Sequence, residues 1–393
     1  MNKILIIGSQ GYLGSRLTDY LLSHGYHCVG SDIGFFQYGV LFYPMNVQTL
    51  NIEAKNITET IIRDFDVVIL LAGISNDPLE NLDAEMIYNP TRDYSKRIAK
   101  MCKNLGIRFL FPSSCSVYGI GDGILNEDGA TFPQSAYSLN KIQIEQELSE
   151  LADDSFSPIA LRLATVFGLS PRMRFDLVIN MLCGMAVTSK KVALNSDGQA
   201  WRPHLHIEDV CEAFRCCIEW NYKGGKLAIL NVGRNDNNWK ILDIANLIQS
   251  KVDGCKLEFL GKDFNGDEED LIRDRKIQDG VDKRTYQVSF DRIHSELPGF
   301  KTLWTVDRGV EQLILELERL ELNEIKFKSN GAKQVYNEIL KDIKKEKFSI
   351  AYFYQRRVRR ILPALIITIA LSIPFALIFL PPADLQNYAK SII

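Results

Sequence analysis

The first 32 residues contain the feature that most limits how this chain can fold. Residues 4–7 are an apolar run, and three glycines spaced three apart follow it at Gly8, Gly11 and Gly14. Apolar residues at helical spacing come next, and a second short run ends in Asp32. This order predicts a strand, a tight glycine turn, a helix, a second strand and an acid at its end.

The same residue types in this order favour a dinucleotide site. Glycines let the backbone pass close to a pyrophosphate, and the following helix presents free N–H groups and a partial positive charge to it. An acid at the end of the second strand can bind the hydroxyls of an adenosine ribose. Because Asp32 would repel a 2′-phosphate, we expect NAD rather than NADP as the cofactor.

Strands and helices are expected to alternate along the first half of the chain. A short strand near residues 43–47, a buried strand at 66–71 and a strand at 108–111 are separated by helical segments, one of them interrupted by Pro90. This alternation predicts an α/β fold with a Rossmann-type, doubly wound parallel sheet. Ligands bind such a sheet at the carboxyl ends of its strands.

A candidate catalytic group follows the strand at 108–111. That strand runs into Ser113 and Ser114, and further on Tyr137 and Lys141 stand four residues apart on one face of a helix. A nearby ammonium, together with a nicotinamide cation, lowers the pKa of a phenol, which makes Tyr137 a credible general base. With Ser114 holding the reacting oxygen, the set suits hydride transfer at a secondary alcohol.

These motifs together resemble a known family. The resemblance rests on three patterns: Gly8-x-x-Gly11-x-x-Gly14, Ser113-Ser114-x-x-Val117-Tyr118-Gly119 and Tyr137-x-x-x-Lys141. They resemble the extended short-chain dehydrogenase/reductases, and most closely the NAD-dependent nucleotide-sugar epimerases and dehydratases. The resemblance continues through residues 162–168 and 197–210 and covers roughly residues 1–315.

The resemblance implies a role for each matching residue. Tyr137 would be the acid/base, Lys141 would orient the nicotinamide ribose, and Ser114 would bond the sugar hydroxyl. The implied NAD-binding residues are Gly8, Gly11, Tyr12, Leu13, Gly14, Asp32, Asn46, Val47, Leu71, Ala72, Gly73, Asn89 and Lys141. The substrate would be a nucleotide-diphosphate sugar, and its candidate contacts are Ser75, Ser116, Arg174, Asn180, Arg202 and Arg284. Arg202 and Arg284 would clamp the diphosphate. The resemblance also suggests a homodimer.

Departures from the family pattern narrow the reaction. The 4,6-dehydratases carry an Asp-Glu pair directly after the hydroxyl residue, whereas this chain has Cys115 and Ser116. Enzymes that epimerise C3 and C5 need a cysteine and a histidine; Cys115 is one residue out of register, and no histidine follows shortly after Gly168. We therefore expect a C4 epimerase. The alternatives are a 4-keto-sugar reductase or a dehydratase of the same family, and a non-catalytic NAD-binding scaffold at the membrane.

Four regions are expected along the chain. Residues 1–165 would form the NAD-binding domain, 166–320 mainly a smaller substrate-binding lobe, 321–347 a linker and 348–393 a membrane segment. Residues 361–380 carry no charge and are long enough to cross a bilayer, after a basic flank that stays on the cytoplasmic side. The expected location is therefore a cytoplasmic catalytic domain tethered to the inner face of the membrane.

The last fifty or so residues also resemble a fragment of the membrane-bound acyltransferases of the acyltransferase 3 family. Those enzymes need a histidine in an earlier membrane segment, and no histidine follows His294 here, so we expect no acyl transfer. A net charge of −3 gives no reason to expect nucleic-acid binding. Eight cysteines without a C-x-x-C pair indicate neither a metal site nor a disulfide framework.

Overall fold

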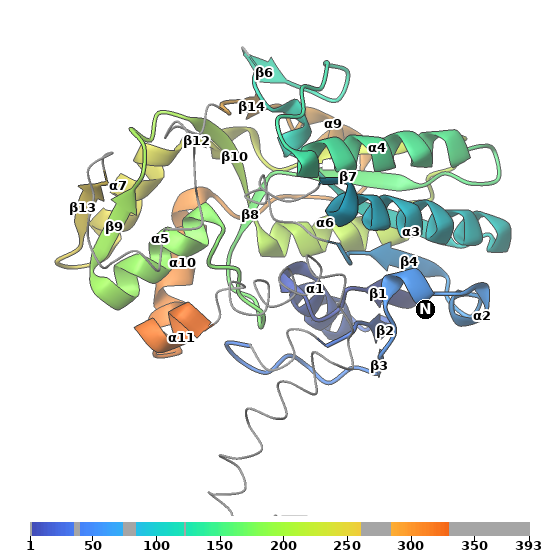
Figure 1. The fold of residues 1–393 in the computed structure, drawn as a ribbon, viewed down its shortest axis with the longest axis horizontal. Coiled ribbons are helices and arrows are strands. Elements are labelled where there is room, and N and C mark those ends of the chain that lie inside the picture. Colours follow the sequence, from blue (N-terminus) through green and yellow to red (C-terminus); the bar gives the residue numbers. More distant parts are fainter. Residues whose placement is uncertain (1, 35–39, 74–83, 122, 261–283, 330–393) are drawn as a thin grey trace, which may run out of the picture. The chain divides into compact units, whose positions relative to one another are not determined.

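Seven parallel strands form the central sheet of the molecule (Figure 1). The computed structural model describes residues 2–34, 40–73, 84–121, 123–260 and 284–329. The strands are β1 (Lys3–Ile7), β2 (His27–Ser31), β3 (Thr49–Leu50), β4 (Val67–Leu70), β5 (Arg108–Ser114), β7 (Ile159–Leu163) and β11 (Ala228–Val232). Their order across the sheet is β11-β7-β5-β4-β1-β2-β3, which confirms the expected Rossmann-type fold. The strand order reverses between β1 and β4, so a crevice is expected at their carboxyl ends.

Helices cover both faces of this sheet, because the central strands are apolar on both sides. Ile4 and Ile6 of β1 share one core with helices α1 (Tyr12–Ser23) and α6 (Ile207–Glu219). Leu5 and Ile7 face the other core, which includes α2 (Glu59–Ile62), α3 (Ala84–Leu105) and α4 (Ala136–Leu151). An unbroken apolar run is what a parallel strand buried on both faces requires.

Two local expectations need correction. The third strand is not at 43–47 but at Thr49–Leu50, where it pairs with Gly30 and Ser31 of β2. Helix α3 continues through Pro90 and is not split there. Pro90 lies in the first two turns of the helix, where its missing N–H removes a single backbone bond.

The chain from residue 124 onward also builds smaller sheets beside the large one. Their strands are β6 (Ile124–Leu125), β8 (Thr165–Phe167), β9 (Lys191–Leu194), β10 (Trp201–His206), β12 (Asn238–Lys240), β13 (Lys256–Phe259) and β14 (Gln287–Val288). They pair as β12-β10-β8, β13-β9 and β14-β6. Its other helices are α5 (Val178–Ser189), α7 (Ile241–Lys251), α9 (Asp291–Glu296), α10 (Val306–Arg319) and α11 (Glu324–Ser329). Strand β11 lies beyond residue 165 but belongs to the large sheet. Part of the region predicted as the substrate-binding lobe therefore returns to the NAD-binding domain.

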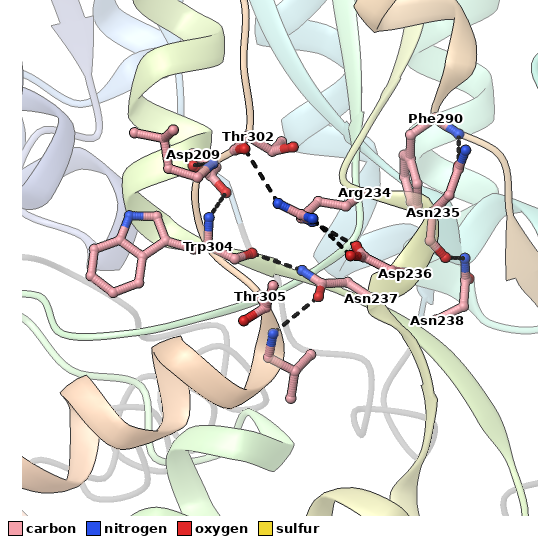
Figure 2. Close-up of polar contacts among 12 residues, drawn as sticks. Asp209, Arg234, Asn235, Asp236, Asn237, Asn238, Phe290, Thr302, Trp304 and Thr305 are labelled. Carbon is pink, nitrogen blue, oxygen red and sulfur yellow. Dashed lines mark hydrogen bonds and ion pairs between the residues drawn. The ribbon is translucent and has the colours of Figure 1, made fainter.

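Buried amide and carboxylate groups join three segments of the second half of the chain (Figure 2). The Asn237 side chain donates to the Trp304 carbonyl at 3.0 Å and accepts from the Val306 N–H at 3.0 Å. Asp209 accepts from two further backbone N–H groups of residues 303–304 at 2.9 and 3.1 Å. The side chains of Asn237 and Asp209 thereby supply hydrogen-bond partners for the irregular backbone of residues 303–306. These bonds fix the path of the chain into α10.

The predicted tail falls outside this description. Within the described ranges, no helix is both long and apolar enough to span a bilayer. The expected membrane segment 361–380 and the acyltransferase-like stretch 348–393 lie beyond residue 329, where the description ends.

Candidate active site

The glycine turn after β1 is shaped by close backbone packing. Gly8 has a φ of +93°, and a Cβ there would lie 2.5 Å from the Ala72 nitrogen. A Cβ on Gly14 would lie 2.0 Å from the Gly8 carbonyl oxygen. A Cβ on Gly11 would meet nothing nearer than that same oxygen at 3.5 Å. Gly8 and Gly14 are therefore needed by the turn itself, whereas Gly11 leaves the backbone open to a ligand.

Asp32 is bonded to this turn from the end of β2. One carboxylate oxygen accepts from the Gln10 N–H at 2.9 Å, and the other accepts from the Gly34 N–H at 3.0 Å. Burial raises the pKa of Asp32, while these bonds oppose that shift. The Ile33 N–H also bonds to this carboxylate, and a carboxylate has about four lone-pair sites, so one site would remain to accept a hydroxyl. The buried side-chain oxygens of Ser9 and Gln10 also have no hydrogen-bond partner among the described residues.

The two predicted catalytic hydroxyls are brought together. Ser114 is the last residue of β5, and Tyr137 lies in the first turn of α4, after a capping box formed by Ser135 and Ser138. Burial raises the pKa of Tyr137, whereas the charge of Arg174 and hydrogen bonding by the Ser114 side chain both lower it.

Lys141 lies one helical turn beyond Tyr137, as its spacing predicted. Its ammonium donates to the Pro112 carbonyl at 2.6 Å and lies 5.5 Å from the centre of the Tyr137 ring. Burial lowers the pKa of Lys141 to about 7, and the negative charge of Glu145 opposes that shift. The lysine is therefore close to its titration point near neutral pH.

A loop after β8 carries Arg174 to the same place. Arg174 interacts electrostatically with Tyr137 and forms a two-bond ion pair with Asp176, at 3.0 and 2.5 Å. Asn180 holds this loop from α5, because its side chain donates to the Arg174 carbonyl at 3.1 Å and accepts from the Gly168 N–H at 2.9 Å.

Two predicted ligand contacts point elsewhere. The Tyr12 hydroxyl donates to the Gly168 carbonyl at 2.9 Å and accepts from the Asn180 amide at 3.2 Å. Both side chains are buried, and each is paired within the protein. The Tyr12 hydroxyl and the Asn180 amide are therefore bonded within the protein, and the predicted contacts of these residues with cofactor and substrate stay predictions.

The two predicted diphosphate clamps lie beside each other. The Arg202 guanidinium, on β10, donates to the Arg284 carbonyl and to the Trp201 carbonyl at 2.8 Å. It also lies 5.2 Å from the centre of the Tyr286 ring. Burial lowers the pKa of Arg284. The Arg202 guanidinium and the Arg284 backbone, from distant parts of the sequence, therefore lie in contact.

The remaining predicted residues are placed as follows. Leu13, Val47, Leu71, Ala72 and Asn89 are half-buried, whereas Asn46 and Gly73 are exposed. The Ser116 hydroxyl oxygen is buried without a partner among the described residues. Ser75 lies outside the described residues. No cluster of potential metal ligands occurs within the described ranges.

Sequence comparison places this site in a family. The model of the NAD dependent epimerase/dehydratase family matches residues 4–233, which is more than half of the chain. The chain belongs to the NAD dependent epimerase/dehydratase family. NAD is thereby confirmed as its cofactor.

Similar proteins of this family are known. The chain is 26% identical over 267 residues to the uncharacterized UDP-glucose epimerase YtcB of Bacillus subtilis, a match covering 63% of this chain and 81% of YtcB. It is 23% identical over 335 residues to the UDP-glucose 4-epimerase of Azospirillum brasilense, covering 79% and 94% of the two chains. The solved structure of TunA, an NAD-dependent NDP-hexosamine 5,6-dehydratase, superposes with a TM-score of 0.68 at 17% identity, covering 81% of this chain and 98% of TunA. That similarity shows the fold.

The residues present in this epimerase/dehydratase family member fit NAD. The pyrophosphate would lie on the turn at Gly11, the N-cap of α1, where among the described residues the Gly8 carbonyl oxygen is the one atom within 4 Å of an added Cβ. The adenosine ribose would bind the Asp32 carboxylate, and the unpaired oxygens of Ser9 and Gln10 would add polar contacts. Lys141 lies on α4 beside the carboxyl end of β5, and it would reach the nicotinamide ribose.

Sequence reasoning missed one part of the site in this family member. Glu145 is a buried carboxylate on α4, hydrogen-bonded to Ser113 and ion-paired with Arg162 of β7. Its spacing was a usable signal, since it stands four residues after Lys141 on the same face of the helix. Its partners could not be predicted, because Ser113 and Arg162 come from other strands.

Proposed function

We propose that this protein is an NAD-dependent nucleotide-sugar epimerase acting at C4 of the sugar. The observation that carries the proposal is the placement of Lys141, which donates to the Pro112 carbonyl of β5, two residues before Ser114, at 2.6 Å and lies 5.5 Å from the centre of the Tyr137 ring. The glycine turn and Asp32 lie at the carboxyl ends of β1 and β2 in the same sheet. A sugar held by the two hydroxyls would therefore face a nicotinamide laid across the strand ends.

The chemistry is a reversible oxidation. Ser114 orients the C4 hydroxyl, and Tyr137, as phenolate, takes its proton while the C4 hydrogen leaves as hydride. NAD, held by the turn at Gly11, by Asp32 and by Lys141, would supply the group that takes and returns this hydride. Once the 4-keto sugar presents its opposite face for return of the hydrogen to C4, Tyr137 would give the proton back to the C4 oxygen. Proton and hydride are both restored, so the reaction consumes no cofactor.

Two cations would support the Tyr137 phenolate. Lys141 lies beneath the ring, and the Arg174 charge acts on the Tyr137 hydroxyl from the loop after β8. A positive charge near a phenol stabilises its anion and lowers its pKa. The Arg174 charge opposes the effect of burial, which by itself would keep the phenol protonated.

The neighbours of Ser114 argue against dehydration. Cys115 is buried, donates to the Arg162 carbonyl at 3.1 Å and has a raised thiol pKa because of its burial. Ser116 offers a hydroxyl. Neither side chain is a carboxylic acid that could protonate a leaving hydroxyl in a dehydratase.

We assign the binding of the nucleotide sugar to three arginines. Arg202 and Arg284 would bind the diphosphate, because a guanidinium matches its oxygens in charge and in fork geometry. Arg174, which is already bonded to Asp176, would face the sugar beside Tyr137.

The test is incubation of the purified chain with NAD and a panel of UDP- and dTDP-hexoses, followed by NMR of the sugars. The expected result is interconversion of C4 epimers with the NAD absorbance unchanged. Net reduction of a 4-keto sugar with consumption of NADH or NADPH would overturn the proposal in favour of a reductase. If no nucleotide sugar in the panel is changed or bound, the proposal fails altogether.

A further inference from the structure

A buried carboxylate lies directly behind the catalytic hydroxyls. One oxygen of Glu145 accepts from the Ser113 hydroxyl at 2.5 Å and from Arg162 Nε at 3.0 Å. Its other oxygen accepts from Arg162 Nη2 at 2.7 Å. All three residues are buried, so the carboxylate and the guanidinium neutralise each other away from water.

The position of Glu145 joins the two elements that carry the reacting groups. It stands eight residues after Tyr137 and four after Lys141, so the three side chains lie along one stripe of α4. Its other partner, Ser113, immediately precedes Ser114 at the end of β5. A single carboxylate is therefore bonded to the strand end that carries Ser114 while it belongs to the helix that carries Tyr137.

Arg162 fixes this carboxylate from a third element. Its remaining terminal nitrogen donates to the Tyr118 hydroxyl at 3.0 Å, and that hydroxyl donates to the Asn231 side chain at 2.9 Å. Tyr118 and Asn231 are fully buried. The bonds thus run from α4 through β7 to β11, and a fully paired buried network of this kind is rigid.

We propose that Glu145, paired with Arg162, is a positioning residue for the reaction: it holds Ser114 and Tyr137 at bonding distance and sets a negative charge below the Lys141 ammonium. The inference rests on the proposed function and deepens it. Glu145 touches neither cofactor nor sugar, so it acts only through its neighbours.

The role of Glu145 can be measured through the protonation of Lys141. From its own helix, Lys141 faces Tyr137 and Glu145; from β5 it faces the Phe111 ring and the Pro112 carbonyl. Helix α3 also packs on α4, but its Lys96 is paired with Glu147. Among the described residues, Glu145 is therefore the charged group with a resolved influence on the pKa of Lys141, and it raises that pKa against burial.

The decisive variant is Glu145→Gln, which keeps the shape of the side chain and removes its charge. We expect kcat to fall about 10- to 100-fold with KM for the nucleotide sugar little changed, because misplacement of reacting groups affects the chemical step. The basic limb of the pH profile should move to lower pH, since Lys141 loses the charge that keeps it protonated. A kcat and a basic limb both equal to those of the wild type would overturn the proposal.

Glu147→Gln is the matched control. Glu147 lies on the same helix two residues further on and pairs with the half-exposed Lys96. Because this half-buried carboxylate pairs with Lys96 and not with the groups around Lys141, its removal should leave kcat and the pH profile unchanged. An equal shift of the basic limb in both variants would show a general charge effect and would also overturn the specific role of Glu145.

A second variant guards against misfolding, because Glu145→Gln leaves the Arg162 charge buried without its partner. The double variant Glu145→Gln/Arg162→Met removes both charges, and it should recover thermal stability without recovering kcat. Recovery of both would mean that Glu145 acts only on folding, against the proposal.

A readout without turnover separates this inference from the proposed function. The Lys141 Cε signal can be titrated by NMR in ¹³C-lysine protein and assigned by its loss in Lys141→Met. The pKa of Lys141 should be lower in Glu145→Gln than in the wild type, and an unchanged pKa would refute the inference. If the wild type epimerises no sugar, the proposed function fails while this titration still decides the role of Glu145.

Discussion

Lys141 connects Tyr137 to the strand end that carries Ser114, because its ammonium donates to the Pro112 carbonyl at 2.6 Å and lies 5.5 Å from the centre of the Tyr137 ring. This arrangement would place the Tyr137 and Ser114 hydroxyls where a single sugar oxygen could bind both. It depends on the packing of α4 against β5, and so on the Glu145 carboxylate that links the two elements.

Replacing Tyr137 with phenylalanine should abolish the chemistry and spare binding. The ring remains, but the group that accepts the C4 proton is lost, so kcat should fall by about two to four orders of magnitude. NAD affinity, measured by calorimetry, should stay within a fewfold of the wild type. A Tyr137→Phe protein with unchanged turnover would rule out the proposed base.

Alanine substitutions at Gly11 and Gly14 should have different effects, because Gly11 is assigned to NAD binding and Gly14 to the packing of the glycine turn. A Cβ on Gly11 meets nothing nearer than 3.5 Å, so Gly11→Ala should fold normally and bind NAD more weakly. A Cβ on Gly14 would lie 2.0 Å from the Gly8 carbonyl oxygen, so Gly14→Ala should lose about 1–3 kcal/mol of unfolding free energy. Denaturant unfolding and calorimetry measure both. Equal NAD affinity in Gly11→Ala and the wild type would contradict the placement of the pyrophosphate.

Lys141 should make the stability of the NAD-free protein depend on pH. Burial lowers its pKa to about 7 in the fold, below the ordinary value of 10.5, so the folded state binds fewer protons than the unfolded state between these values. The unfolding free energy should therefore rise with pH across this window, and the burial cost should be largest below pH 7. Measured against the wild type, Lys141→Met should gain more stability at pH 6 than at pH 9. A constant difference over that range would show that Lys141 is not buried as described.

The arginine pair should govern substrate binding rather than turnover. Arg202→Gln and Arg284→Gln each remove a cation from the region assigned to the diphosphate, so KM for the nucleotide sugar should rise about tenfold or more with a smaller change in kcat. Steady-state kinetics at saturating NAD measure this. Unchanged KM in both variants would place the diphosphate elsewhere.

The C-terminal segment 361–380 remains a prediction from sequence, and it can be tested on the full chain. The wild type should sediment with membranes and resist extraction by high salt. The variant Ile369→Lys/Leu371→Lys should move to the supernatant, because each lysine at the centre of a membrane helix costs about 3 kcal/mol. A wild type that stays in the supernatant would contradict the predicted tether.

Much of the fold could be predicted because its signals are local. The apolar runs mark strands buried on both faces, and the glycine spacing marks the turn at Gly8. The stripe of Tyr137 and Lys141 follows from helix geometry, and the structure brings both to the strand edge that carries Ser114.

The remaining features depend on pairs that are distant in the sequence. Tyr12 sits inside the glycine motif, and only the structure shows its hydroxyl bonded to Gly168 and Asn180 in the core. The pairing of Glu145 with Arg162 likewise needs the helix and the strand side by side. Local propensity predicts which helix or strand a residue belongs to, whereas tertiary packing determines which side chains that residue contacts.

The central claim is transient oxidation at C4, with Tyr137 as the base and with return of the same hydride. Its most direct measurement uses a nucleotide hexose with deuterium at C4, incubated with the protein and NAD in ordinary water and followed by NMR. The account predicts that the epimer forms with the deuterium still at C4 and with no net NADH. Loss of the deuterium to water during epimerisation would contradict it, because the C4 hydrogen would then leave as a proton.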